Sequence, residues 1–110
     1  MTQPDHLAHY VSAILGHASL RTARVEAANE QTWFDQGCRV TAEEKIYAFD
    51  DGALVKRLAE QDDFPDDAVC AECWISYEVL RQPHGKVVTP CRVSFNNACR
   101  EAYWLRYFGS

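Results

Sequence analysis

The sequence is poor in basic residues, in long apolar runs and in the glycine-rich motifs that bind phosphate. Its 110 residues include 11 lysines and arginines against 16 acids, which gives a formal net charge of −5. Nucleic acids and anionic lipids are bound by clustered positive charge, so we expect no nucleic-acid partner and no membrane partner. No apolar run reaches the roughly 18 residues of a transmembrane helix, and the start, MTQPDHLAHY, lacks the pattern of a signal peptide. GxGxxG, P-loop and GxSxG motifs are also missing, so no short motif indicates nucleotide binding or a serine hydrolase.

The composition that remains is that of an ordinary globular domain. Hydrophobic residues make up 47% of the chain and charged residues 25%, as in folded proteins generally. A chain of this length is expected to form a single α+β domain over residues 1–110, with one core that needs neither metals nor disulfides. The cysteines number five, an odd count without a signal peptide, which is typical of reduced thiols and predicts a cytoplasmic protein.

Hydrophobic periodicity predicts a helix near each end of the chain. Leu7, Val11 and Ile14 form one apolar stripe, so the first helix is expected over residues 4–16. The last helix is expected from Ser94, as its cap, to Phe108. Its buried side is predicted to carry Phe95, Cys99, Ala102 and Leu105.

Between the helices the sequence predicts an antiparallel meander sheet of four or five strands. The clearest hairpin joins residues 45–49 to 53–58 through Asp50-Asp51-Gly52, and a helix over 53–61 is the competing interpretation. Residues 69–81 alternate between apolar and polar side chains and predict a long strand, with 86–90 as its antiparallel partner. Residues 31–40 fit a strand with a bulge at Gly37, and residues 19–29 fit either a strand or a helix, with the strand preferred. Helices packed on such a sheet make a two-layer α+β fold.

The pair Cys70 and Cys73 raises the question of metal or redox chemistry. The two residues are three positions apart in the predicted strand, so their side chains point to opposite faces of the sheet. In that geometry they neither share a zinc ion nor form a disulfide with each other. Cys91 and Cys99 would complete a four-thiolate site only if the strand began after Cys73. We therefore predict no metal, no cofactor and no catalytic residue, and we expect Ile75→Asp to abolish the folding of a domain held together by apolar packing.

Two further clusters carry charged or titratable groups. His6 and His9 lie at i and i+3 of the predicted first helix but off its apolar stripe, which is typical of solvated histidines rather than of a metal site. The segment EQDDFPDD at 60–67 holds five carboxylates without the register of an EF-hand. We interpret it as a solvated acidic loop, with electrostatic contact to a basic protein partner as the alternative.

Apolar and aromatic residues are too numerous for a sheet with one solvated face. The hairpin is expected to place Tyr47, Phe49, Leu54 and Leu58 on one side, yet apolar residues recur on the other side as well. The protein's own second helix is the simplest cover for this surplus, and pairing with a second subunit comes next, so we expect a homodimer. The candidate residues for binding a partner or a ligand are Trp33, Tyr47, Phe49, Trp74, Trp104, Asp62, Asp63, Asp66 and Asp67.

Two classes of function fit these observations. The first is a small, acidic, cytoplasmic binding or regulatory protein without catalysis, which acts through a protein partner or through self-association. The second is a small-ligand-binding protein or a small enzyme with an apolar pocket on the sheet. A deep pocket between sheet and helix would favour the second class, and a filled interior with a flat apolar patch would favour the first.

Overall fold

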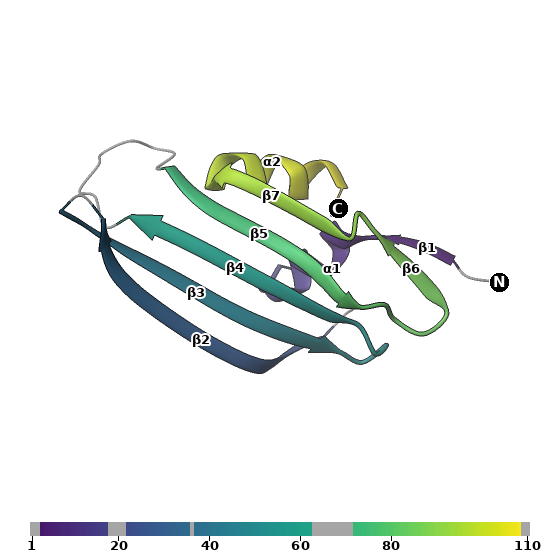
Figure 1. Ribbon diagram of the computed structural model, residues 1–110. Coiled ribbons are helices and arrows are strands. Elements are labelled where there is room, and N and C mark those ends of the chain that lie inside the picture. Colours follow the sequence, from purple (N-terminus) through teal and green to yellow (C-terminus); the bar gives the residue numbers. More distant parts are fainter. Residues whose placement is uncertain (1–2, 18–21, 36, 63–71, 109–110) are drawn as a thin grey trace.

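A computed structural model describes residues 3–17, 22–35, 37–62 and 72–108 of the chain. Five strands form an antiparallel sheet in the order β2-β3-β4-β5-β7, and two helices pack on one face of it (Figure 1). The predicted α+β fold, with a helix near each end of the chain and an antiparallel sheet between them, is confirmed. The helices are α1 (Leu7–Ile14) and α2 (Ala98–Phe108), and the strands of the sheet are β2 (Ala23–Asp35), β3 (Cys38–Phe49), β4 (Leu54–Asp62), β5 (Glu72–Arg81) and β7 (Arg92–Asn97).

The first helix is shorter than predicted because the residues before it are extended. Residues Gln3–His6 form β1, which pairs in parallel with β6 (Lys86–Thr89). The helix then begins after His6, whose Nδ1 accepts a hydrogen bond from the Ala8 N–H at 3.1 Å. This bond satisfies one of the backbone donors that the first turn of a helix leaves free. The predicted range 4–16 therefore loses its first turn to a strand.

The β3–β4 hairpin is confirmed, and the residues from Leu54 onward form a strand rather than a helix. The Phe49 N–H donates to the Ala53 carbonyl at 3.0 Å, which closes a three-residue loop with Gly52 at a φ of +92°. Tyr47 consequently pairs with Val55, and Leu54 and Leu58 lie on the face opposite Tyr47 and Phe49. The prediction that these four side chains share a face is wrong, because it would require a two-residue loop, which shifts the pairing by one position.

The C-terminal part of the sheet differs from the prediction in its strand order. Residues 86–89 pair with β1 rather than with β5, and β7 is the antiparallel neighbour of β5. Ser94 lies within β7 and does not cap α2. Asn97 takes that role, since its side-chain oxygen accepts the Arg100 N–H at 2.8 Å. Gly37 lies in the turn between β2 and β3, and the bulge in β2 falls between Val25 and Ala27 instead.

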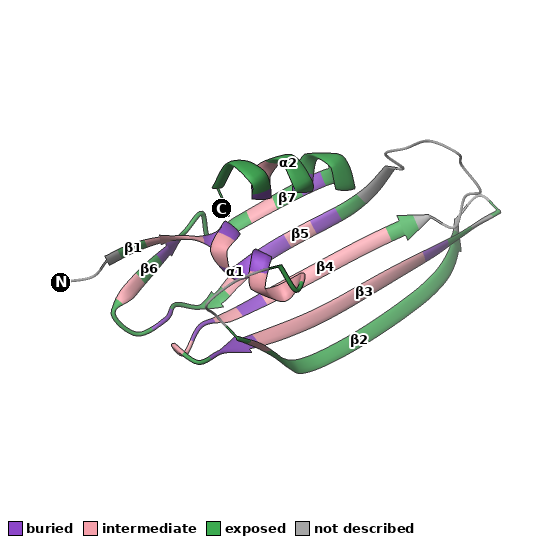
Figure 2. Cartoon of the chain, turned by 180° about the vertical axis from the view of Figure 1, so that it is seen from behind, coloured by how far each residue is buried: buried purple, intermediate pink, exposed green. Residues whose placement is uncertain are grey.

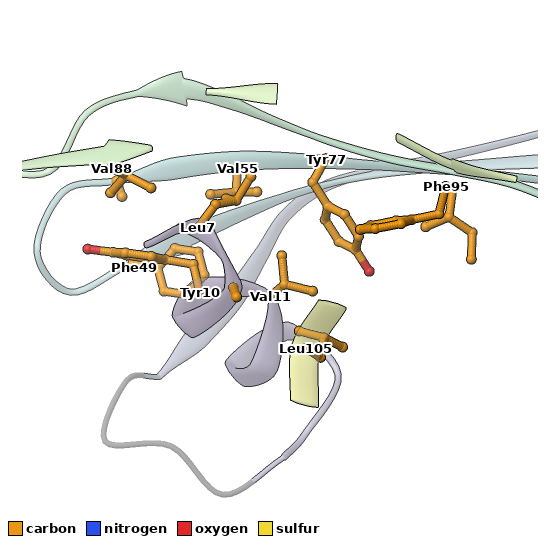
Figure 3. Close-up of a cluster of buried hydrophobic side chains, with 12 residues drawn as sticks. Leu7, Tyr10, Val11, Phe49, Val55, Tyr77, Val88, Phe95 and Leu105 are labelled. Atoms are coloured by element: carbon orange, nitrogen blue, oxygen red, sulfur yellow. The ribbon is translucent and has the colours of Figure 1, made fainter. Parts of the chain in front are cut away.

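The core lies between α1 and the sheet (Figure 3). Leu7, Tyr10 and Val11 point from α1 toward the strands that carry Val55 and Tyr77, and all five side chains are fully buried. Leu105 of α2 and Phe95 of β7 extend the same cluster. Burial of each large apolar side chain contributes about 1.5–3 kcal/mol to stability. In β5 the predicted alternation holds over its described side chains, with Ile75 and Tyr77 buried and Trp74 and Leu80 exposed.

The helices cover one end of one sheet face. Figure 2 shows α1 and α2 in front of the sheet near β5 and β7, while most of β2, β3 and β4 extends beyond them. Figure 1 looks onto the opposite face, where no helix of the described chain lies in front of the strands. We call this side the open face, and the side that carries α1 and α2 the helix face.

Candidate functional site

Two exposed tryptophans stand at one end of the open face. Trp74 of β5 lies opposite Glu60 of β4, which in turn lies opposite Ala42 of β3, and Trp33 of β2 lies opposite Val40 of β3. Residues directly opposite each other in antiparallel strands share a face. Trp33 is 38% exposed and Trp74 is 55% exposed. Three strand spacings separate β2 from β5, so the two indoles flank a strip about 15 Å wide.

Acidic side chains lie on the same end of this face. Glu60 is the cross-strand neighbour of Trp74, and Glu44 lies on β3 one row farther along. Neither glutamate takes part in the ion pairs of the described residues. The basic residues of the open face on β2, β4 and β7, which are Arg24, Lys56 and Arg92, lie in the rows toward the other end. We call Trp33, Ala42, Glu44, Glu60 and Trp74 the tryptophan end of the open face; Val40, which pairs with Trp33, is buried.

The structure places the other candidate residues elsewhere. Phe49 is buried in the core with its ring 4.8 Å from that of Tyr10, and Tyr47 packs partly buried beside it on the helix face. Trp104 lies on α2 with its ring 5.2 Å from that of Phe95. Of the predicted aromatics, Trp33 and Trp74 are the two exposed ones, and both lie on the open face. Asp62 ends β4, but its side chain and the residues Asp63, Asp66 and Asp67 lie outside the described part of the chain.

A buried polar network on the helix face was not predicted. The Tyr77 hydroxyl donates to the Glu101 carboxylate at 2.7 Å and accepts from Arg57 Nε at 3.1 Å. Burial and the negative charge of Glu101 raise the pKa of Tyr77 well above its usual range, so the phenol remains a proton donor. Burial alone would lower the pKa of Arg57, but Tyr77 and Glu101 more than offset this and raise it.

One sequence signal pointed to this network. Glu101 lies four residues before Leu105 and therefore on the same side of α2. The predicted buried side of this helix is confirmed for Phe95 and Leu105 but wrong for Cys99 and Ala102, which are exposed, and Glu101 is buried instead. The network joins β4, β5 and α2, and its main role is to fix α2 on the sheet.

The histidines of the N-terminal region hold structure together. His6 is not solvated as predicted, because its ring stacks on Phe108 at 4.3 Å and lies 5.6 Å from Trp104. Burial, and to a lesser degree the nearby His9, lower the pKa of His6, whereas Asp5 acts in the opposite direction. His9 Nδ1 lies 2.8 Å from the Asp5 carboxylate. Because that carboxylate also accepts the His6 N–H, these contacts fasten the start of α1.

The cysteines are not all reduced thiols. Cys99 is disulfide-bonded, whereas Cys91 is free and exposed. The expectation of five reduced thiols is therefore wrong, and the argument from thiols to a cytoplasmic location loses its premise. Cys70 lies outside the described residues, as does the side chain of Cys73. β5 begins at Glu72, so Cys73 already belongs to the strand.

The described residues offer little support for a metal site or a deep pocket. No three His, Cys, Asp or Glu side chains among them gather closely enough to hold a metal ion. An open hollow of about 520 Å³ lies between β7 and α2 and is lined by Ser94, Phe95, Asn97, Cys99, Arg100 and Tyr103. β7 is the neighbour of β5, and Phe95 pairs with Ile75, so the hollow lies about one strand away from Trp74. Neither α1 nor α2 has the length and apolar character needed to cross a bilayer.

Comparison with known proteins adds no analogy, since no protein-family model, curated protein or solved structure matches the chain. The function has to be argued from the surface itself.

Proposed function

We propose that this protein is a non-catalytic binding protein that holds a basic polypeptide segment on the tryptophan end of its open face. The observation that carries the proposal is the placement of Trp33 and Trp74 on either side of a strip that holds Ala42 and Glu60, with Glu44 and Leu58 in the next row. Exposed tryptophans are uncommon on surfaces without a partner and are enriched at the centres of interfaces.

The chemistry of this end favours a cationic partner. A lysine or arginine side chain is attracted to the face of an indole. Glu60 lies beside Trp74, Glu44 lies in the next row, and neither has an ion-pair partner in the described chain. The acidic sequence that continues from β4 through residues 60–67 starts at the same end. An acidic partner would meet like charges here, so the surface discriminates by sign as well as by shape.

The interior supports binding rather than catalysis. The space between α1 and the sheet is occupied by Leu7, Tyr10, Val11 and the strand residues that they contact (Figure 3). These side chains fill the space under α1, and the hollow between β7 and α2 is open to solvent rather than deep. Such a surface suits a macromolecule better than a small ligand.

Titration with two designed peptides tests the proposal. One peptide alternates lysine with leucine, and the other has glutamate in place of each lysine. We expect the basic peptide to bind, and Trp74→Ala or Trp33→Ala to weaken that binding about tenfold, as for aromatic residues at the centre of an interface. Tyr107→Ala is the matched control, because Tyr107 is an exposed aromatic on α2, outside the open face.

Charge reversal provides the second arm of the experiment. Glu60→Lys is expected to abolish binding of the basic peptide, whereas Glu78→Lys, on the same face but beyond the tryptophan end, is expected to have a smaller effect. Equal affinity for both peptides, or binding that ignores Trp33 and Trp74, would show that the open face has another role.

A further inference from the structure

We propose that two copies of this chain pair through the outer edges of β2, antiparallel about a two-fold axis at Asn29, so that their two five-stranded sheets become one. This inference concerns the backbone edge of β2. It shares Trp33 with the surface proposed for the basic partner, so Trp74, which lies on β5, is the residue that tests the basic partner alone. It deepens the expectation of a homodimer by naming the strand, the register and the contacts.

β2 presents a long edge that the described part of the chain leaves unpaired. It is the outermost strand in the sheet order and runs for 13 residues, and all residues from 24 to 34 are exposed. Proteins usually protect such an edge with proline, lysine or a very short strand, because free N–H and C=O groups accept another strand. β2 contains no proline and no lysine. The features that oppose pairing are the charges of Arg24, Glu26 and Glu30 and the bulge between Val25 and Ala27, and of these only Glu30 falls within residues 27–34. Its edge is therefore built to accept a strand.

The sequence of β2 is compatible with a second copy in one register. Antiparallel pairing of identical strands generates a closed two-fold dimer, and Asn29 is the middle residue of Ala23–Asp35. An axis at Asn29 places Ala28 opposite Glu30 of the second copy and Ala27 opposite Gln31 of the second copy. No charged residue then faces a like charge. The two Asn29 side chains face each other, and amides can both donate and accept.

Neighbouring registers are worse for definable reasons. An axis at Glu30 places this carboxylate opposite its own copy, and like charges directly opposite across strands destabilise the pairing. An axis at Ala28 leaves Trp33 and Phe34 beyond the end of the partner strand. Phe34 is 75% exposed and would remain exposed in that register, so the dimer would bury less apolar surface.

The bulge keeps the outer contacts on matching faces. If Glu26 is the extra residue, Arg24 lies opposite Trp33 of the second copy and Ala23 lies opposite Phe34 of the second copy. In β2 itself, Arg24 and Trp33 both belong to the open face, because they pair with Ala48 and Val40, whereas Ala23 and Phe34 belong to the helix face. The two-fold axis produces each contact twice. A guanidinium over an indole at both ends therefore adds attraction to the backbone hydrogen bonds.

Sedimentation equilibrium of the full chain with matched acidic substitutions is the first test. We expect a mass of two chains for the wild-type protein. Asn29→Asp places two carboxylates opposite each other at the axis and is expected to weaken the dimer about fivefold. Gln31→Glu adds the same charge on the same strand and face but lies opposite Ala27 of the second copy, so it should leave the dimer nearly unchanged. Arg24→Glu should weaken it about tenfold because it removes both contacts with Trp33.

Oxidative cross-linking fixes the register. In a Cys91→Ser background, which removes the free exposed thiol of the described residues, Asn29→Cys is expected to form a covalent dimer that the background alone does not form, since directly opposite residues lie within disulfide reach. Gln31→Cys should not do so, because the two copies of residue 31 are several rows apart. Circular dichroism verifies that each variant is folded.

Three outcomes would overturn the proposal. They are a wild-type mass of one chain at every concentration, equal weakening by Asn29→Asp and Gln31→Glu, and efficient cross-linking at residue 31 in place of residue 29. Peptide binding is measured on the same folded variants, so loss of the dimer and loss of the basic partner are observed separately.

Discussion

Tyr77 connects three elements through a single hydroxyl group. Its phenol lies in the core, accepts from Arg57 of β4 and donates to Glu101 of α2. A buried carboxylate is destabilising unless a donor forms a hydrogen bond with it, and Glu101 is only 8% exposed. The hydroxyl therefore compensates for a charge that α2 brings into the core.

We predict that Tyr77→Phe lowers the free energy of unfolding by about 1–3 kcal/mol, the usual cost of leaving a buried polar group unsatisfied. Chemical denaturation followed by circular dichroism measures this. Tyr47→Phe removes the same atom from a partly buried tyrosine on the same face and should cost less. Equal stability of the two variants would mean that the Glu101 carboxylate finds another donor.

His6 couples the stability of the N-terminal region to pH. Burial lowers the pKa of His6 below its ordinary value of 6.5, and Nδ1 accepts the Ala8 N–H only while it carries no proton. As pH falls through that value, the unfolded chain takes up the proton before the folded chain does. Stability contributed by neutral His6 is therefore present above the ordinary value and is lost as pH falls below it.

We predict that His6→Asn flattens this loss, because asparagine caps a helix without titrating. Denaturation midpoints between about pH 7 and pH 5 measure the slope, a range set by the ordinary histidine pKa. Asp5 and His9, which face His6, remain in place. His17→Asn, at an exposed position after α1, should keep the wild-type slope, and an unchanged slope in His6→Asn would assign the pH dependence to other groups.

At the scale of elements, local patterns in the sequence identified most strands but not their neighbours. The alternation around Ile75 and Tyr77 predicted β5, and Asp50-Asp51-Gly52 predicted the β3–β4 hairpin. The parallel pairing of β1 with β6 joins residues about 80 positions apart in sequence, and no local pattern specifies a contact of that kind. Residues 4–6, which belong to β1, were therefore predicted as the start of a helix.

The candidate site was also predictable only in part, because local patterns specify the face of a side chain within one strand but not the neighbours of that strand. Period-2 alternation placed Trp74 away from the main apolar face, which the structure confirms. The face of Trp33 depends on the register of β2 against β3, because a one-residue bulge or slip moves a side chain to the other face. The sequence alone did not specify this register. The Arg57–Tyr77–Glu101 network depends on where α2 packs, which periodicity within one segment does not specify.

The turns at one end of the sheet interlock, and Gly52 is the point of closest approach. A Cβ atom at residue 52 would lie 2.7 Å from Cδ2 of His84, and the residue has a φ of +92°. The His84 N–H also donates to the Asp51 carbonyl at 2.8 Å. The β3–β4 turn and the turn after β5 therefore pack as one unit.

We predict that Gly52→Ala costs more stability than Gly85→Ala. Both positions have a positive φ, where a residue with a side chain is less stable than glycine by about 1–2 kcal/mol. A Cβ atom at residue 85, however, would have no neighbour within 4 Å. The excess measures the contact with His84, and adding His84→Ala to Gly52→Ala should remove it. Equal costs at the two glycines would indicate that the His84 ring moves aside freely.

At the scale of the whole molecule, support for the sheet is unequal along its length. The molecule measures 53 × 28 × 20 Å, and the buried cluster lies at the end where α1 meets Phe49, Val55 and Tyr77. At the other end of β3, Thr41 and Glu43 pair with strands on both sides but have no helix above them (Figure 2). Backbone hydrogen bonds are thus similar along β3, whereas apolar burial is not.

Hydrogen exchange should reveal this gradient, because local opening is cheapest where few apolar contacts resist it. We predict that amides at 47–49 exchange at least about tenfold more slowly than hydrogen-bonded amides at 39–43 of the same strand. The measurement is made on Asn29→Asp at a concentration where sedimentation gives the mass of one chain, so that pairing of β2 with a second copy does not protect the far end. Uniform protection along β3 would mean that the sheet opens only as a whole, and that the long unsupported end is as rigid as the end packed on α1.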